Sequence, residues 1–362
     1  MKVAELQKPE APKYWKLADH LMSLIRSGEV KPGDRLPSFA QLRADYGASR
    51  PTAERAHAIL EQHGLIERRS GQGIFVASQL PAGRLNAHQG IIGISGGGFN
   101  YSSRSSYWAA MLGEMRETAE CGGAQILLLD HTSSRGWEKA DGIIICEWSG
   151  RIARLLPPGI AWLSLMTSRH DGASVCTNEL GGMRAATEHL LGLGHRRIAY
   201  LHAPYGFNTA QRMAGYREAL QSAQIPFRSR YLHALPRHLA FGDDFVNQGR
   251  TAMRDWLAGN WEALDCTAIL AHNDETAIGV MQALREANVC VPEDVSVVGF
   301  DGLNIGDICT PRLTTIKVPL QEIGARAVEM LLQQLNSEKI SSQHCVLPSA
   351  LLMRESTGQA RR

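Results

Sequence analysis

Apolar residues in the first 80 positions recur every three or four residues in three short segments, the spacing of helices with one buried face. The first segment covers residues 14–27. Ser38 stands three positions before Gln41, the spacing of a capping box, and predicts the start of a second helix. Ser49 is placed to cap a third helix, so a turn of only a few residues joins the second helix to the third. This arrangement predicts a helix-turn-helix.

Behind the third helix the chain changes to two short strands around a glycine-rich tip. Residues 65–69 and 74–76 flank the tip sequence Ser70-Gly71-Gln72-Gly73 and predict a hairpin, or wing. Residues 78–89 contain Pro and Gly and have no apolar period, so we expect a linker there. Residues 1–77 are therefore predicted to form a winged helix-turn-helix domain of the α+β class.

From residue 90 onward, apolar strands alternate with amphipathic helices. Strands are expected at residues 91–95, 125–129, 142–146, 161–165, 197–202, 268–271 and 296–300. Helices are expected at residues 108–120, 181–193, 210–221, 248–258, 275–287 and 320–335. Apolar strands separated by helices form parallel sheets that are covered on both faces. We therefore expect an α/β domain over residues 90–357, followed by a tail at 358–362.

Composition and charge narrow the class of protein. Of the 362 residues, 44% are hydrophobic and 20% are charged, which excludes a disordered chain or a coiled coil. No apolar run approaches the ~18 residues of a membrane-spanning helix, and no signal-peptide core follows Met1, so we expect a cytoplasmic protein. The seven cysteines lie at least 19 positions apart and form no metal-binding motif, so we expect no metal and no cofactor. Residues 1–80 carry twelve Lys or Arg against nine Asp or Glu, which is compatible with contact to nucleic acid.

The first module resembles the GntR family of winged-helix DNA-binding domains over residues 13–77. The matching text is Tyr14-Trp15-Lys16-Leu17-Ala18, Pro32-Gly33-Asp34-Arg35-Leu36-Pro37-Ser38, Ser49-Arg50-Pro51-Thr52, Gly64-Leu65-Ile66 and Arg69-Ser70-Gly71-Gln72-Gly73-Ile74-Phe75-Val76. The resemblance implies that the third helix enters the major groove of double-stranded operator DNA. The DNA contacts expected from motif position and charge are Arg35, Ser38, Ser49, Arg50, Pro51, Thr52, Arg69, Gly71, Gln72 and Gly73.

Two positions depart from the GntR pattern. Many family members carry Arg where this chain has Ala40 and Glu54. Glu54 either accepts a hydrogen bond from a cytosine amino group or repels phosphate and faces away from the DNA.

The second module resembles the effector-binding region of LacI/GalR repressors, a bilobed fold shared with periplasmic binding proteins of type I. The matching text includes Leu193-Gly194-His195-Arg196-Arg197-Ile198-Ala199-Tyr200, Arg212-Met213-Ala214-Gly215-Tyr216, Ala271-His272-Asn273-Asp274-Glu275-Thr276-Ala277, Val291-Pro292-Glu293-Asp294-Val295-Ser296-Val297-Val298-Gly299-Phe300-Asp301-Gly302 and Pro311-Arg312-Leu313-Thr314-Thr315-Ile316. On this resemblance we expect an N-lobe at about residues 90–175 and 303–337 and a C-lobe at about 176–302 and 340–357.

In such a fold a ligand lies beyond the carboxyl ends of the strands, in the cleft between the lobes. The candidate effector-binding residues are Tyr107, Glu147, Asn208, Arg212, Asn273 and Asp301. Carboxylate, amide and guanidinium groups around an aromatic ring can bind adjacent hydroxyl groups. The resemblance implies that the effector is a sugar or sugar derivative.

The connection over residues 130–140 is short for a parallel crossover that contains a helix. We expect the family's helix to be reduced to a loop here. Part of one sheet face would then need another cover, such as a partner subunit.

These features predict a transcriptional regulator, a repressor by resemblance, that acts as a homodimer and responds to a small-molecule effector. The chain is not expected to be an enzyme. One alternative is a serine hydrolase, because Gly93-Ile94-Ser95-Gly96-Gly97 fits the GxSxG pattern with Ser95 as the nucleophile. A second is a regulator that senses a metabolite other than a sugar, and a third is a solute-binding protein, for which residues 13–77 would have no use.

Overall fold

The computed structural model describes residues 13–26, 28–62, 64–69, 73–78, 90–96, 106–130, 136–146, 150–166, 172–204, 207–235, 244–336 and 343–361. The chain divides into two units, Met1–His88 and Gln89–Arg362. Most of the expected linker, residues 79–89, lies outside the described residues.

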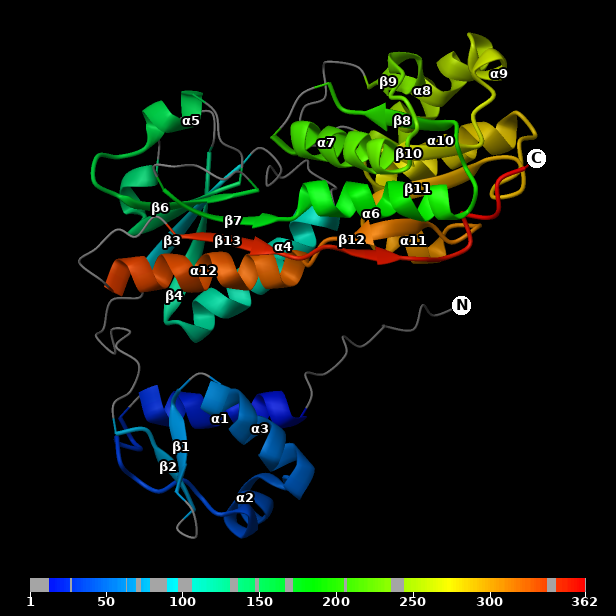
Figure 1. The fold of residues 1–362 in the computed structure, drawn as a ribbon. Coiled ribbons are helices and arrows are strands. Elements are labelled where there is room, and N and C mark those ends of the chain that lie inside the picture. Colours follow the sequence, from blue (N-terminus) through cyan, green and yellow to red (C-terminus); the bar gives the residue numbers. More distant parts are fainter. Residues whose placement is uncertain are drawn as a thin grey trace, which may run out of the picture. The chain divides into compact units, whose positions relative to one another are not determined.

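The first unit is a winged helix-turn-helix, as predicted (Figure 1). Its elements are α1 (Lys13–Arg26), α2 (Phe39–Tyr46), α3 (Arg50–Gln62), β1 (Ile66–Arg69) and β2 (Gly73–Val76). Leu21, Leu42, Leu60 and Val76 are fully buried, so all three helices and the wing share one apolar core. Burial of this apolar surface stabilises a domain too small to depend on propensity alone.

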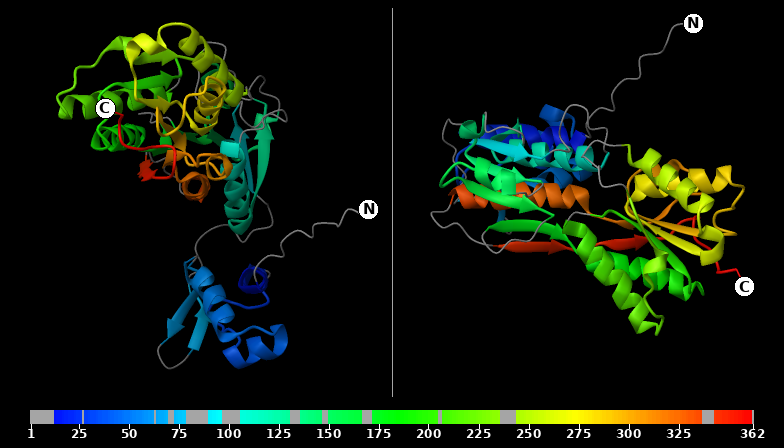
Figure 2. Two further views of the ribbon diagram at one scale, coloured as in Figure 1. Left: turned by 90° about the vertical axis from the view of Figure 1, so that its right-hand side faces the viewer. Right: turned by 90° about the horizontal axis from the view of Figure 1, so that it is seen from above.

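The second unit contains two six-stranded sheets, each flanked by helices (Figure 2). The N-lobe sheet has the order β13-β7-β6-β5-β3-β4, and all of its strands are parallel. Its strands are β3 (Gly90–Ser95), β4 (Ala124–Leu129), β5 (Gly142–Ile145), β6 (Ala161–Leu165), β7 (Ala173–Thr177) and β13 (His344–Leu347). Its helices are α4 (Ser106–Cys121), α5 (Gly150–Leu155) and α12 (Leu320–Asn336).

The C-lobe sheet has the order β14-β12-β11-β10-β8-β9, and only its edge strand β14 is antiparallel. Its strands are β8 (Ile198–His202), β9 (Leu232–Ala234), β10 (Ala268–Ala271), β11 (Ser296–Asp301), β12 (Thr314–Lys317) and β14 (Ala350–Leu352). Its helices are α6 (Glu179–Gly192), α7 (Phe207–Ser222), α8 (Phe245–Ala258), α9 (Trp261–Leu264), α10 (Asp274–Glu286) and α11 (Ile305–Ile308). The predicted fold class, two α/β lobes behind a winged helix, is confirmed.

Successive residues of the C-lobe strands face opposite helix layers. On β8, Tyr200 packs in the same apolar cluster as Tyr216 of α7, whereas Leu201 packs in the same cluster as Met253 of α8. Both faces of each central strand are therefore buried, which is why the strands are apolar throughout.

The chain passes between the lobes three times, and two of these passages differ from the expected lobe boundaries. It leaves the N-lobe after β7, returns between β12 and α12, and crosses again between β13 and β14. The expectation that residues 303–337 belong to the N-lobe and 340–357 to the C-lobe is therefore corrected: β12 lies in the C-lobe sheet and β13 in the N-lobe sheet. Short strands of small and polar residues carry little periodic signal, so their partners could not be assigned from spacing.

The sheet face beside the shortened connection after β4 is covered by a residue of the same chain. Residues 131–135 lie outside the described residues, but a single 3₁₀ turn at Trp137–Lys139 follows them. The Trp137 indole is 1% exposed and packs in one cluster with Leu129, Ile143 and Ile145. Its Nε1 donates a hydrogen bond to the Asp130 carbonyl at 3.0 Å. One large side chain thus covers the sheet face that was expected to need another cover.

Two helices of the C-lobe, α8 and α10, pack backbone against backbone. An ideal Cβ built on Gly279 of α10 would lie 1.9 Å from the Val246 carbonyl oxygen of α8, and one on Gly249 of α8 would lie 2.3 Å from the Thr276 carbonyl oxygen. No side chain fits at either position without moving a helix.

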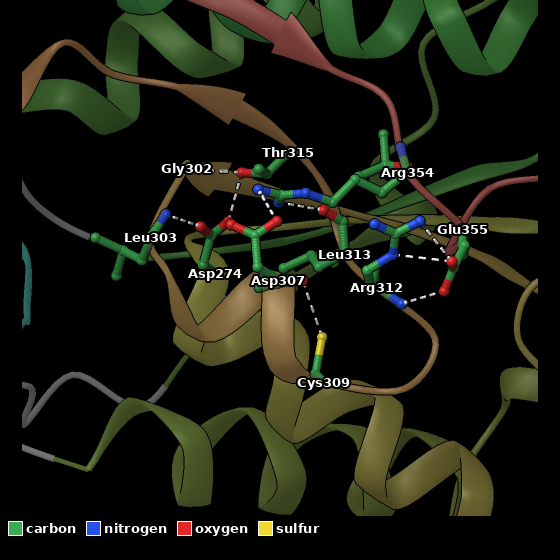
Figure 3. A network of polar contacts seen from close by, with 12 residues as sticks. Asp274, Gly302, Leu303, Asp307, Cys309, Arg312, Leu313, Thr315, Arg354 and Glu355 are labelled. Carbon is green, nitrogen blue, oxygen red and sulfur yellow. Dashed lines mark hydrogen bonds and ion pairs between the residues drawn. The ribbon is translucent and has the colours of Figure 1, made fainter.

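A polar network ties α10 to the turn behind β11 (Figure 3). Asp274 is fully buried, and its Oδ2 accepts a hydrogen bond from the Leu303 backbone N–H at 2.7 Å. Its Oδ1 accepts from the Thr315 hydroxyl. Burial raises the pKa of the Asp274 carboxyl to about 6, although these hydrogen bonds oppose the shift. Asp274 therefore fixes the turn that follows Asp301.

We expect Gly279→Ala to lower the free energy of unfolding by about 1–3 kcal/mol or more, because the methyl group overlaps the α8 backbone. The measurement is chemical or thermal unfolding of the full chain. Gly113→Ala on α4 is the matched control, since an added Cβ there meets nothing within 4 Å. That control should be neutral or stabilise by up to ~1 kcal/mol. Equal effects of the two substitutions would contradict the close packing.

We expect the stability of the wild-type chain relative to Asp274→Asn to fall as pH rises from 4 to 7. An acid whose pKa is higher in the folded state than in the unfolded chain favours folding while it is protonated, and this contribution is lost as pH passes the folded value of about 6. The difference should change by about 3 kcal/mol, at ~1.4 kcal/mol per pKa unit. Unfolding free energies of both chains across this pH range test it, and a difference that does not vary with pH would contradict it.

Candidate functional site

Both helices of the helix-turn-helix begin with hydroxyl caps. Ser38 Oγ accepts a hydrogen bond from the Gln41 backbone N–H, and Gln41 Oε1 accepts from the Ser38 backbone N–H, so the predicted capping box is confirmed. Ser49 Oγ accepts from the Thr52 backbone N–H at 3.3 Å and bonds to the Thr52 hydroxyl at 2.7 Å. Gly47, with a left-handed backbone at φ 63°, makes the turn between α2 and α3. Pro51 lies in the first turn of α3, where its missing N–H costs no hydrogen bond.

The turn before α2 and the wing come together at Arg35. An ideal Cβ on Gly73 would lie 2.9 Å from Arg35 Nε, and Gly73 has a φ of 118°, so only glycine fits there. The backbone of Arg35 also forms an isolated antiparallel β-bridge with Phe75 of β2. The wing-tip residues Gly71 and Gln72 lie outside the described residues.

Arg69 and Arg50 each lie beside an acid. Arg69 Nη2 is 2.6 Å from Glu67 Oε1, and its guanidinium lies 4.5 Å from the centre of the Phe75 ring. Arg50 Nε is 3.1 Å from Glu54 Oε1, one turn further along α3. Glu54 therefore lies on the same face of α3 as the arginine that we expect to contact DNA.

A shallow hollow lies where α2 meets the start of α3. It is lined by Phe39, Ala40, Arg43, Gly47, Ala48, Ser49 and Arg50. Arg43 was not singled out from the sequence, and the structure shows it exposed on α2. Both Ala40, where the family pattern carries Arg, and Arg50 line this hollow.

A second cluster of candidate side chains surrounds the buried guanidinium of Arg212 on α7. Its Nε is 2.6 Å from Glu179 Oε2 at the start of α6, and its Nη2 is 3.8 Å from Asp301 Oδ1 at the end of β11. The Phe300 ring centre lies 3.7 Å from the guanidinium, and Nη1 donates to the His272 carbonyl. Arg212, Glu179 and Asp301 are all at least nine-tenths buried.

Burial and charge set the protonation of this cluster. Burial alone would lower the pKa of Arg212, but the Glu179 and Asp301 carboxylates raise it above its usual value, so the guanidinium is charged. Burial raises the pKa of Asp301 well above its usual value despite Arg212. Burial and the nearby Arg212 charge lower the pKa of His272 to about 3, so this imidazole is neutral near pH 7. Asp301 also has a φ of 126°, a strained backbone of the kind found at binding sites.

Tyr107, on α4 of the N-lobe, lies close to this C-lobe cluster. Burial raises the pKa of its phenol, and the charges of Asp301 and Glu179 raise it further. The structure thus brings Tyr107, Arg212 and Asp301 together across the junction of the lobes.

The remaining candidates from the sequence are Asn273, Asn208 and Glu147. Asn273 is the N-cap of α10, where its Oδ1 accepts from the Thr276 backbone N–H at 2.8 Å. Asn208 lies one turn before Arg212 on α7. Glu147 and the neighbouring Trp148 lie outside the described residues.

Glu179 was missed from the sequence, because the strand that precedes it, β7, was not predicted. Ala173-Ser174-Val175-Cys176-Thr177 carries too few large apolar residues to be recognised, yet every one of its residues is buried. The Asn178 cap that opens α6 was the available signal.

The Ser95 side chain is 0% exposed at the end of β3, so its hydroxyl is not presented on an exposed turn as a nucleophile elbow requires. The hydrolase alternative is therefore wrong. The described part of the chain contains no group of three or more His, Cys, Asp or Glu side chains placed to hold a metal ion. None of its helices is both long enough and apolar enough to cross a membrane.

Two family descriptions match the chain. Residues 13–76 match the bacterial regulatory proteins of the gntR family, and residues 187–357 match the periplasmic binding protein-like domain. The arabinose metabolism transcriptional repressor of Geobacillus stearothermophilus is 26% identical over 356 residues, which cover 92% of this chain and 94% of that repressor.

A second relative matches mainly the second unit. The ribose operon repressor of Escherichia coli K12 is 33% identical over 226 residues, and the match spans 60% of this chain but only 66% of that repressor. Among solved structures, a LacI family transcriptional regulator from Enterococcus faecium with bound ribose has a TM-score of 0.65 and 24% identity, over 75% of this chain and all of that one. Residues 13–76 are therefore a gntR-family DNA-binding domain, residues 187–357 belong to a periplasmic-binding-protein-like domain, and the chain is a transcriptional regulator that combines the two.

Proposed function

We propose that this regulator is a repressor whose affinity for operator DNA is controlled by a sugar or sugar derivative bound at the Arg212 cluster. Residues 1–77 would bind DNA, residues 78–89 would act as the linker, and residues 90–357 would bind the effector. We further propose that it acts in the cytoplasm as a homodimer, because two half-sites match a two-fold symmetric protein.

The observation that carries the effector proposal is the buried polar cluster of Arg212, Glu179 and Asp301 at the carboxyl end of the C-lobe strands, with Tyr107 of the N-lobe near enough to sense its charges. Asp301 and Arg212 supply an acceptor and a donor, and Tyr107 supplies an aromatic face from the other lobe. Adjacent hydroxyl groups can satisfy a carboxylate and a guanidinium at once. The arabinose and ribose in the names of the two repressors fit this chemistry. A ligand that touches both lobes would favour one arrangement of the lobes over another.

The DNA proposal is supported by hydroxyl-capped helix starts and exposed arginines on α2, α3 and the wing. The first N–H groups of a helix and its positive dipole attract phosphate. We expect contacts from Arg35, Ser38, Ser49, Arg50, Pro51, Thr52, Arg69, Gly71, Gln72 and Gly73.

We expect Arg35→Ala to weaken binding to all duplexes by a similar factor, because Arg35 would neutralise a phosphate and read no base. The slope of log affinity against log salt should fall in magnitude by about 1. The measurement is fluorescence anisotropy across a salt series, with the duplex that the wild-type chain enriches from a random pool. Arg312→Ala, which removes an exposed arginine of the second unit paired with Glu355, is the control and should leave the slope unchanged. The absence of any enriched duplex would contradict the DNA proposal itself.

We expect Asp301→Asn to weaken the effect of the sugar at least tenfold while leaving DNA affinity without sugar unchanged, because an amide accepts fewer hydrogen bonds than a carboxylate. Calorimetry measures sugar binding, and release of bound DNA measures the response to the sugar. The panel includes arabinose, ribose, galactose and cellobiose. Asp307→Asn is the control, since Asp307 is a half-exposed acid paired with Arg354 at 2.7 Å. A normal sugar response in Asp301→Asn would contradict this site. A wild-type chain that binds DNA but responds to no sugar would favour a different metabolite.

A further inference from the structure

Arg50 and Glu54 form an exposed ion pair on the first two turns of α3. Arg50 Nε lies 3.1 Å from Glu54 Oε1, and the two side chains are 77% and 49% exposed. The hydrogen bond to Glu54 uses Arg50 Nε rather than a terminal nitrogen. The pair therefore leaves the two donors of a bidentate contact available.

The ion pair contributes little to the stability of the helix. A positive charge in the first turn opposes the helix dipole, and an Arg that precedes Glu by four positions is the weaker orientation of such a pair. Exposed pairs of this kind contribute about 0–1 kcal/mol. Their position on the helix is better explained by a partner outside the chain.

The surroundings restrict where the guanidinium can point. Arg50 lies 5.6 Å from the centre of the Phe39 ring and borders the hollow between α2 and α3. Phe39 on one side and Glu54 on the other hold the side chain beside the start of the helix. An arginine held in one orientation loses less side-chain entropy when it binds a base edge.

The charge of Glu54 decides which part of DNA it can face. A carboxylate beside phosphate is repelled, whereas over the floor of the major groove it can accept from a cytosine amino group. Phosphate contacts have other candidates: within the described residues, Arg35 and Arg43 are arginines of the first unit with no ion-pair partner. Glu54 therefore does not need to lie at the backbone for the domain to bind.

We propose that Arg50 and Glu54 read DNA as one unit, in which Arg50 donates two hydrogen bonds to a guanine and the free oxygen of Glu54 accepts from the amino group of a cytosine beside it. The proposal rests on the proposed DNA-binding function. It makes Glu54, at a position where the related family pattern carries Arg, a residue that determines sequence specificity. The operator half-site should then contain a guanine and a cytosine next to each other or paired to each other.

The experiment is selection of duplexes from a random pool by the full wild-type chain and by Glu54→Gln, followed by anisotropy with single-base-pair variants. In the wild-type selection, one cytosine beside a guanine should be preferred at least tenfold. A glutamine amide can pair with adenine, so Glu54→Gln should lose this preference for cytosine and gain one for adenine at that position. Replacing the neighbouring guanine by 7-deazaguanine should weaken wild-type binding and have no effect on Arg50→Ala.

Glu61→Gln is the matched control. It removes the same charge from a later turn of the same helix, where Glu61 pairs with Arg68 at 2.9 Å. It should raise affinity for all duplexes by a similar factor and leave the base preferences unchanged. Thermal unfolding of each variant checks that the exposed substitutions leave the fold intact.

Each result has a defined meaning. Unchanged preference for cytosine in Glu54→Gln, with the same uniform rise in affinity as Glu61→Gln, would overturn the proposal while leaving the DNA-binding function in place. Loss of the guanine preference alone would also overturn it, because Glu54 would then only orient Arg50. Failure of the wild-type chain to enrich any sequence would instead contradict the proposed function.

Discussion

The second unit is organised around one buried cation. Removing a guanidinium from water costs several kcal/mol, so Arg212 requires partners that come with the fold. They come from three segments: Glu179 at the start of α6, the His272 carbonyl behind β10, and Asp301 with Phe300 at the end of β11. The guanidinium therefore holds the carboxyl edge of the C-lobe sheet in one arrangement. These groups are therefore held in position by contacts within the chain itself.

The same edge is where the chain passes between the lobes. Asn178 donates a backbone hydrogen bond to the Leu347 carbonyl, and Val318 donates one to the Asp301 carbonyl, so the crossing segments lie beside the cluster. Tyr107 approaches from the N-lobe and is close enough for the cluster's charges to raise its pKa. A change in the relative position of the lobes would alter the surroundings of the same few side chains. In the proposed function, this arrangement would link effector binding to the relative position of the lobes.

Three arginines of the first unit pair with acids near the surface. Arg50, Arg68 and Arg69 each lie within 3.1 Å of a Glu oxygen, and exposed pairs contribute little to stability. For Arg68 and Arg69, phosphate oxygens can replace the acid at small cost, because these side chains already lie at the surface. The acids also lower the net positive charge of the domain, which reduces non-specific binding and gives base contacts more influence on the choice of site.

Local patterns in the sequence determined the class of each unit, the long helices and the apolar central strands, because their periodicity is set by which face each residue buries. They also identified Ser38 and Ser49 as caps, whereas the resemblance to the LacI/GalR effector-binding region made Arg212 and Asp301 candidates for one site. Only the tertiary structure decided that β12 belongs to the C-lobe and β13 to the N-lobe, since β13 pairs with a strand about 170 residues away. The role of Glu179 and the Trp137 cover were decided in the same way. A buried charge or a covered face depends on which segments meet in space, and no local period carries that information.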